Sequence, residues 1–187
     1  MIEASRRLDD SRLGPRSLGE RGPRRPVHPT IGIMRGTVTN AFDLRHARAG
    51  DREWLYALHC ATMRDVVERT WGWDEAWQRA HFNSRFAPAA ISVITVAGRD
   101  VGVLSLQARP SELYVAALEI APEMQGRGLG TAVTRRVLAE AASRRLPVTL
   151  QVLKANEGAR RLYERLGFQV TGQVEHHLRM RHAGAEP

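Results

Sequence analysis

Three glycines separated by single residues form the segment whose chemistry is easiest to recognise. The segment Gln-Gly-Arg-Gly-Leu-Gly-Thr, residues 125–131, follows an apolar run at 114–120 and precedes a helical pattern at 131–145. A strand, a glycine turn and a helix in this order direct backbone N–H groups and the positive end of the helix toward an anion. Glycine leaves room for a phosphate and permits positive φ. We therefore expect this segment to bind a phosphate-bearing cofactor.

The spacing of the glycines narrows the kind of cofactor. A Walker A loop requires a Lys that is absent here, and the dinucleotide fingerprint has its glycines at positions 1, 3 and 6. The observed pattern is Gln125-x-x-Gly128-x-Gly130 instead. A glycine turn without a ligand remains the alternative at this point.

A second motif follows about thirty residues later. Residues 147–153 have the length and composition of a buried strand, and a helical pattern at 157–166 then begins after Asn156, a plausible N-cap. The string Asn156-Glu-Gly-Ala-Arg-Arg-Leu-Tyr163-Glu-Arg-Leu-Gly-Phe168 and the glycine segment, in this order and at this separation, resemble the GNAT (Gcn5-related N-acetyltransferase) superfamily.

The resemblance implies an α/β (α+β) class and the GNAT fold. This fold has a mixed, mostly antiparallel sheet flanked by helices and splayed between its fourth and fifth strands. The hydrophobic patterns agree with the order β-α-α-β-β-β-α-β-α-β-β. The expected strands begin near Phe42, and helices are expected at about 52–68 and 74–84. A hairpin is expected at 90–96 and 101–107, turning at Gly98-Arg99-Asp100.

The resemblance also implies acetyl-CoA as co-substrate and no metal. Ile120 and Pro122 would bracket a strand bulge whose backbone pairs with the pantetheine arm and polarises the thioester carbonyl. Arg127 would add charge to a phosphate, with a solvated loop arginine as the alternative. The expected cofactor-binding residues are Ile120, Ala121, Pro122, Gln125, Gly126, Arg127, Gly128, Leu129, Gly130, Thr131 and Asn156.

For catalysis, the resemblance assigns Tyr163 as the acid that protonates the leaving thiolate, with core packing as the alternative. The base is less well determined, because Gln151 stands where some relatives have a glutamate, and Tyr114 and Ala116 occupy the region used by others. Glu119 is the nearest carboxylate, although strand alternation offsets it by one residue. We expect Glu119 or a water relay to accept the amine proton.

Acceptor recognition is expected in the segment that contains all four tryptophans, 54–77. Trp71, Trp73 and Asp74 are the predicted substrate-binding residues, with Asp74 or Glu75 attracting an ammonium group. His176 and His177 are predicted to be adjacent in a strand and to point to opposite faces, which makes a metal site at this pair improbable.

The composition limits the function classes. The 187 residues carry a net charge of +8, and Lys154 is the single lysine among 28 basic residues, a skew typical of a GC-rich bacterial genome. We expect neither a specific nucleic-acid site nor a membrane span, and a cytoplasmic location. The lone Cys60 excludes an internal disulfide and is expected to be a small buried side chain.

The predicted domains are an Arg/Pro-rich tail at 1–38, the acetyltransferase domain at 39–183 and a flexible end at 184–187. Met34 is a candidate initiator. The predicted function is transfer of acetyl from acetyl-CoA to a primary amine of an unidentified small-molecule or peptide acceptor. The alternatives are a protein N-terminal or lysine acetyltransferase, a non-catalytic acyl-CoA-binding regulatory module, and a nucleic-acid-associated protein that uses its basic tail. A homodimer is one candidate assembly.

Overall fold

The computed structural model describes residues 42–184, so the predicted tail 1–38 and its boundary lie outside the described residues. Within this range the helices and strands follow one another in the predicted order. They are β1 (Asp43–His46), α1 (Arg52–Trp71), α2 (Glu75–Arg85), β2 (Ser92–Val96), β3 (Arg99–Arg109), β4 (Glu112–Ile120), α3 (Leu129–Ser143), β5 (Val148–Leu153), α4 (Glu157–Arg165), β6 (Gln169–Val174) and β7 (His177–His182).

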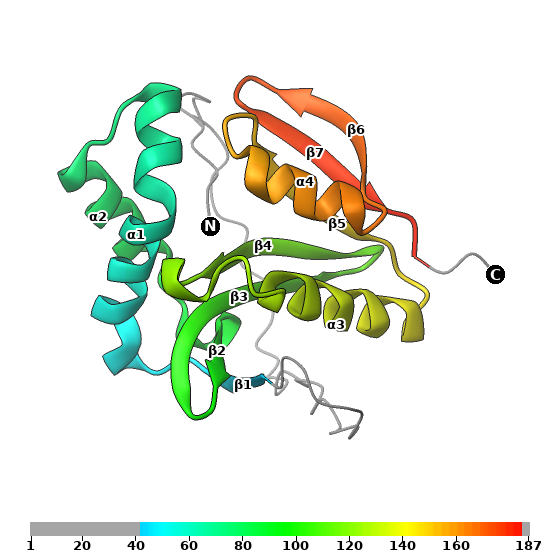
Figure 1. Ribbon diagram of the computed structural model, residues 1–187, viewed down its shortest axis with the longest axis horizontal. Helices are drawn as coiled ribbons and strands as arrows, with labels where there is room; N and C mark the ends of the chain where they lie inside the picture. The colour runs from blue at the N-terminus through cyan, green and yellow to red at the C-terminus, as the bar shows by residue number, and fades with distance from the viewer. Residues whose placement is uncertain (1–41, 185–187) are drawn as a thin grey trace, which may run out of the picture. The chain divides into compact units, whose positions relative to one another are not determined.

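The strands form one sheet in the order β1-β2-β3-β4-β5-β7-β6 (Figure 1). Neighbouring strands are antiparallel except for β4 and β5, which are parallel. A parallel pair needs a crossover connection, and α3 supplies it between β4 and β5. The predicted mixed, mostly antiparallel sheet with flanking helices is therefore confirmed.

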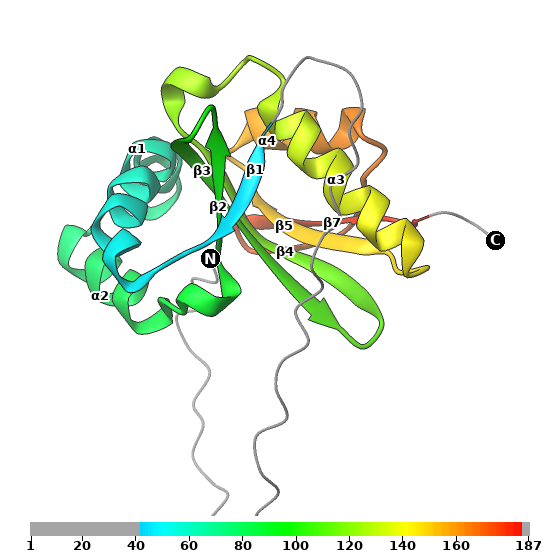
Figure 2. The same cartoon turned by 90° about the horizontal axis from the view of Figure 1, so that it is seen from below.

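Helices cover the two faces of the sheet unequally. The helices α3 and α4 lie on one face, while α1 and α2 lie against the other face at one side of the molecule (Figure 2). The larger core lies under α3 and α4, and smaller clusters lie under α1 and α2. Cys60 is half-buried beside one of these clusters. None of the helices in 42–184 has the length and apolarity to cross a bilayer.

The side chains of β5 alternate between the two faces of the sheet and pack against different helices. Val148, Leu150 and Val152 are buried in the core under α3 and α4. Thr149 and Gln151 point to the opposite face, because successive side chains of a strand alternate. On that face Leu153 packs with residues of α1. The C-terminal end of β5, at Leu153, therefore lies under α1, and the first half of the strand does not.

Several element boundaries differ from the sequence prediction; α1, for example, continues to Trp71 instead of ending near residue 68. Two of the differences concern glycine turns. The β2–β3 hairpin turns at Ala97 and Gly98, both with positive φ, rather than at Gly98-Arg99-Asp100. Two central residues with positive φ match the twist of flanking strands and allow a tighter turn. Helix α3 begins at Leu129, two residues before the predicted Thr131. Part of the glycine segment therefore belongs to the first turn of the helix.

The close approach of β3 to the end of β4 can be tested by substitution of Gly102. A Cβ at this position would lie 2.6 Å from the backbone oxygen of Glu119. We expect Gly102→Ala to lower the free energy of unfolding by about 1–3 kcal/mol, because the backbone must shift to relieve the contact. Urea unfolding measures the loss. Gly50→Ala is the control, since a Cβ there would meet no atom within 4 Å among the described residues other than its chain neighbours. Equal stability of the two variants would contradict this account of the packing.

Candidate active site

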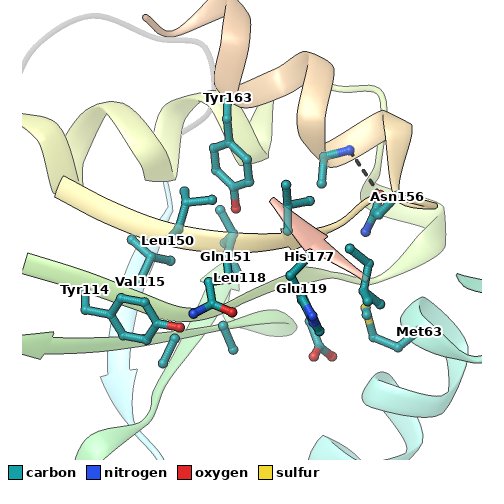
Figure 3. A pocket seen from close by; sticks show the side chains of 15 residues that line it. Met63, Tyr114, Val115, Leu118, Glu119, Leu150, Gln151, Asn156, Tyr163 and His177 are labelled. Atoms are coloured by element: carbon teal, nitrogen blue, oxygen red, sulfur yellow. Dashed lines mark hydrogen bonds between the residues drawn. The ribbon is translucent and has the colours of Figure 1, made fainter. Parts of the chain in front are cut away.

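A cleft opens where β4 and β5 separate. The two strands pair only through Leu113–Val115 and Val148–Leu150. Beyond these residues they diverge, and side chains from both strands, α1 and α4 line the gap (Figure 3). The predicted splay between the fourth and fifth strands is therefore present in the structure.

An extra residue in β4 decides which side chains reach this cleft. Ser105 pairs with Ala117 and Leu106 with Val115, so Ala116 is a β-bulge. A bulge shifts the alternation of all later residues by one. Expected between Ile120 and Pro122, the bulge instead lies several residues earlier.

The bulge brings Glu119 onto the face that Tyr114 shares. In a regular strand the side chains of Tyr114 and Glu119 would point to opposite faces, because their positions differ by an odd number of residues. With Ala116 inserted, Glu119 turns toward α1, and Leu118 and Ile120 turn toward the core under α3 and α4. The offset that weakened the sequence argument for Glu119 is removed by this insertion.

Backbone groups of β4 also face the gap. The N–H of Ala121 donates to the oxygen of Val101 at 2.8 Å, so it is used in pairing with β3. Because backbone groups in an antiparallel ladder alternate, the N–H groups of Leu118 and Ile120 point to the β5 side. The Gln125 side-chain amide donates to the Ile120 oxygen at 2.8 Å. Ala121, one of the predicted cofactor-binding residues, therefore does not direct its N–H to the gap, whereas Leu118 does.

The glycine segment has the conformation that its sequence predicts. Gly126 and Gly128 have φ of 72° and 82°, a region that favours glycine. Gly128 is the N-cap of α3, and no acidic side chain lies in the first turn. The N–H groups of Leu129, Gly130 and Thr131 therefore have no partner within the helix. These donors and the helix dipole form a site suited to an anion.

The third glycine serves packing. A Cβ on Gly130 would lie 3.3 Å from Cδ2 of Leu162, so α3 and α4 meet closely here. A cavity of about 590 Å³ runs from the glycine segment to Tyr163 and the end of β4, and Arg165 lines it. Arg127 is exposed and is not among the residues that line the cavity. Arg165 is a basic lining residue that the sequence analysis missed.

Tyr163 reaches the cleft from α4. It is buried, and its ring lies 5.4 Å from that of Phe168. Burial raises the pKa of the Tyr163 hydroxyl to about 12, so the phenol stays protonated at neutral pH. Figure 3 shows its hydroxyl directed into the gap from above β5. The same residue therefore packs in the core and presents a proton donor to the cleft.

Asn156 caps α4 and also lines the cleft. Its side-chain oxygen accepts from the N–H of Ala159 at 3.1 Å, which confirms the predicted N-cap. The amide nitrogen points the other way, toward the cleft (Figure 3). Because the two ends of the amide have different chemistry, one side chain fits both the structural and the ligand-binding prediction.

Glu119 forms a buried cluster with α1. Its Oε1 lies 3.0 Å from Nδ1 of His59, and its Oε2 accepts from the Thr62 hydroxyl at 2.9 Å. Burial opposes ionisation of this carboxyl, but the His59 and Thr62 interactions outweigh it and hold the Glu119 pKa below its usual value. Glu119 is therefore an ionised carboxylate at the α1 side of the cleft.

His59 and Thr62 were missed by the sequence analysis. A signal for them exists, because His59 lies four residues after Leu55 and four before Met63, which are both buried. Residues at this spacing share one helix face, so a histidine among them must also be buried. The sequence does not show which strand residue it would meet.

The predicted acceptor-binding residues do not come together at the cleft. Asp74 caps α2 by accepting from the N–H of Trp77 at 2.9 Å. The Trp71 ring lies 5.4 and 6.2 Å from the rings of His176 and His177, so both histidines face it rather than opposite sides. Trp73 lies behind His59, with the two ring centroids 6.0 Å apart. None of these three predicted residues is among those that line the cleft.

In this segment Glu75, and not Asp74, is the carboxylate with several hydrogen-bond donors around it and a strongly shifted pKa. Its carboxylate accepts from Tyr56, Arg64 and Trp73 at 2.6–2.9 Å. The Trp73 and Tyr56 hydrogen bonds lower the pKa of Glu75 to about 2. Within 42–184 no group of three or more His, Cys, Asp or Glu residues could hold a metal ion.

The family model of the acetyltransferase (GNAT) family matches residues 55–168, more than half of the chain. The chain belongs to this family. Solved structures agree on the fold. A protein from Pyrococcus horikoshii, PH1933, has a TM-score of 0.60 at 18% identity, covering 75% of this chain and 97% of that one. The ribosomal-protein-S18-alanine N-acetyltransferase of Escherichia coli has a TM-score of 0.58 at 18% identity, covering 79% and 97%.

A third structure, the PaiA N-acetyltransferase of Thermoplasma acidophilum in complex with coenzyme A, has a TM-score of 0.59 at 13% identity, covering 76% of this chain and 98% of that one. Among curated proteins, a 5-NmdU N-acetyltransferase of Pseudomonas phage PaMx11 is 42% identical over 65 residues. That stretch is 35% of this chain and 45% of the relative, so the match spans less than half of either protein.

Replacement of His59 by Leu tests the buried pair. We expect the free energy of unfolding at pH 7 to fall by about 3–5 kcal/mol, because the Glu119 carboxylate loses its main partner. In the wild type, the lowered pKa of Glu119 stabilises the folded state fully when the pH is above the ordinary Glu pKa of about 4.3. This stabilisation is lost as the pH falls through the pKa of the folded state. Urea unfolding at pH 7 and pH 4 should therefore show a deficit that narrows at pH 4.

His59→Asn is the matched variant for this experiment. Its side-chain amide can place a nitrogen donor where Nδ1 lies, so we expect it to recover part of the loss at pH 7. A deficit of the same size at both pH values, or no difference between the Leu and Asn variants, would contradict the assigned pair.

Proposed function

We propose that this protein transfers the acetyl group of acetyl-CoA to a primary amine of an acceptor by direct attack. One observation carries the proposal: a cavity lined by the donors at the start of α3 continues to the gap between β4 and β5, where Tyr163 lies. A phosphate-binding end and a proton donor are thereby joined by one channel. Family membership supports the same chemistry.

In this proposal the start of α3 holds the cofactor's pyrophosphate. The N–H groups of Leu129, Gly130 and Thr131 donate to it, and positive φ at Gly128 keeps them convergent. Arg165, at the side of the cavity, adds positive charge. The Asn156 amide nitrogen contacts the arm of the cofactor further along.

The thioester lies in the gap of the sheet. There the β4 backbone offers N–H groups at Leu118 and Ile120 that have no strand partner on the β5 side. One of them donates to the carbonyl oxygen as negative charge develops on it, which lowers the barrier to attack. The pantetheine arm replaces the missing part of β5 by pairing with the same strand edge.

Proton transfer is divided between the two faces of the sheet. Tyr163 approaches from the α4 side and protonates the sulfur that leaves (Figure 3). Glu119 approaches from the α1 side and accepts the amine proton, directly or through a water. The amine nitrogen forms the new C–N bond as the C–S bond breaks. Because the two groups are on opposite faces, the acceptor enters from the α1 side while the cofactor lies on the other.

The acceptor is best sought with a panel of amines. The names of the relatives suggest two members of it, 5-NmdU and a peptide with an N-terminal alanine. Release of CoA and the mass of the acetylated product identify the acceptor. Tight CoA binding with no turnover of any amine would favour a non-catalytic CoA-binding module instead.

Tyr163→Phe tests the acid. We expect kcat to fall by about 10²–10⁴-fold, the usual contribution of a positioned acid, with CoA affinity retained because the ring still packs. Steady-state kinetics and calorimetric titration with CoA measure the two effects. Tyr56→Phe removes a hydroxyl that bonds Glu75 and serves as the control. Wild-type turnover by Tyr163→Phe across the pH range would refute the assignment.

Gly128→Ala tests the phosphate site. An alanine at φ of 82° costs about 1–2 kcal/mol, so the loop should relax and the Kd for CoA should rise about 5–30-fold. Gly98→Ala introduces the same strain, at φ of 76°, in the β2–β3 turn. Calorimetry with CoA should show a weakened Kd in the first variant alone. An equal Kd in both variants would contradict the assigned site.

A further inference from the structure

The sheet face that leads to the cleft from the α1 side is basic. In the pairing of β5 with β7, Gln151 is opposite Arg179 and Thr149 is opposite Arg181. Directly opposite residues point to the same face and have Cβ atoms about 5 Å apart. Gln151 lines the cleft, so Arg179 is its nearest neighbour across the sheet and Arg181 is one step further out.

Helix α1 does not cover these two arginines. It packs on the end of β5 at Leu153, and His177 of β7 is buried there. Two and four residues further along β7, Arg179 and Arg181 are exposed. Figures 1 and 2 show α1 and α2 at one side of the sheet, away from this part of β5 and β7.

Neither arginine is neutralised within the described residues. Arg179 and Arg181 form no ion pair with any residue in 42–184, whereas Arg109, at the opposite rim, is paired with Glu112 at 2.7 Å. Arg109 also lies over the Tyr114 ring, 3.9 Å from its centre, and Tyr114 lines the cleft. The two β7 guanidinium groups, with Cα atoms about 7 Å apart along the strand, are thus available to a ligand.

The cleft offers little to an acceptor with several positive charges. Among the lining residues that the structure describes, Glu119 is the one carboxylate, and its two oxygens already accept from His59 and Thr62. A polyamine would therefore place its second ammonium group near arginine rather than near a carboxylate. An anionic group on the acceptor would meet a guanidinium instead, a charge-assisted and bidentate interaction.

We propose that the acceptor is a primary amine that also carries an anionic group, a carboxylate or a phosphate, bound by Arg179 and Arg181. The amine lies at the gap beside Glu119, and the anion lies on the outer face of β5 and β7. This inference rests on the proposed acetyl transfer for the position of the amine. It concerns recognition and adds no chemical step.

Matched pairs of amines test the charge preference. 4-Aminobutyrate is compared with 4-amino-1-butanol for the carboxylate, and phosphoethanolamine with ethanolamine for the phosphate. We expect the anionic member of at least one pair to have a kcat/KM at least tenfold higher, and spermidine to be poor. The pair with the larger ratio shows which anion the site takes.

The variants Arg179→Gln and Arg181→Gln test whether these two arginines cause the preference for anionic amines. Each should raise KM for the anionic amine about tenfold, with kcat and the neutral amine unaffected. Arg135→Gln, at an exposed arginine of α3, is the control for the change in net charge. A preference for neutral amines or spermidine, or an anionic preference unchanged in both β7 variants, would overturn the inference.

Binding separates this inference from the proposed function. Calorimetric titration of each amine into the CoA-bound protein measures recognition without turnover. Anion-dependent binding that Arg179→Gln and Arg181→Gln each weaken about tenfold supports the anion site even where no acetyl transfer occurs. The failure then falls on the proposed reaction. Anionic amines that bind no better than their neutral partners overturn the anion site, whatever the turnover.

Discussion

The site depends on one inserted residue, Ala116 in β4. A strand has a period of two, so an insertion exchanges the faces and the edges of everything that follows it. Before the bulge, β4 pairs with β5 and sends Leu113 and Val115 into the core under α3 and α4. After it, Glu119 turns to α1 and the backbone donors turn to the open edge. The insertion therefore places both kinds of group at one gap.

Helices on the two faces of the sheet close different parts of the gap. The N-terminus of α3 faces one end of the gap, and no acidic side chain lies in its first turn to satisfy its N–H donors. Helix α4 closes the same face with Tyr163, and α1 closes the other with the pair of His59 and Glu119. A carboxylate buried without such a partner would have its pKa raised and would become neutral. The histidine thus preserves the charge at the α1 side of the gap.

Much of the cofactor side could be predicted from the sequence, because it depends on local features. Glycines with positive φ, an N-cap asparagine and a tyrosine on a short helix follow from residues close together in the chain. The bulge could not be placed, since Ala116 differs in no visible way from a regular strand residue. The partner of Glu119 is sixty residues away and required the fold. The acceptor-binding role of the tryptophan segment stays a prediction, and the contacts that Asp74 makes at a helix end and Trp71 makes with the histidines of the β6–β7 turn could not be read from the sequence.

The same distinction applies to charge. The sequence carries a net charge of +8, and its arginine excess alone indicates composition rather than function. Many arginines in the described part are paired with acidic side chains, often three or four residues away on the same helix or across a turn. Such exposed pairs contribute little to stability and leave little net field. Arg179 and Arg181 differ because the register of β7 places them beside the cleft on a face with no acidic neighbour in the sheet pairing. Position in the sheet, and not the number of charges, is therefore what distinguishes these two arginines as the proposed anion site.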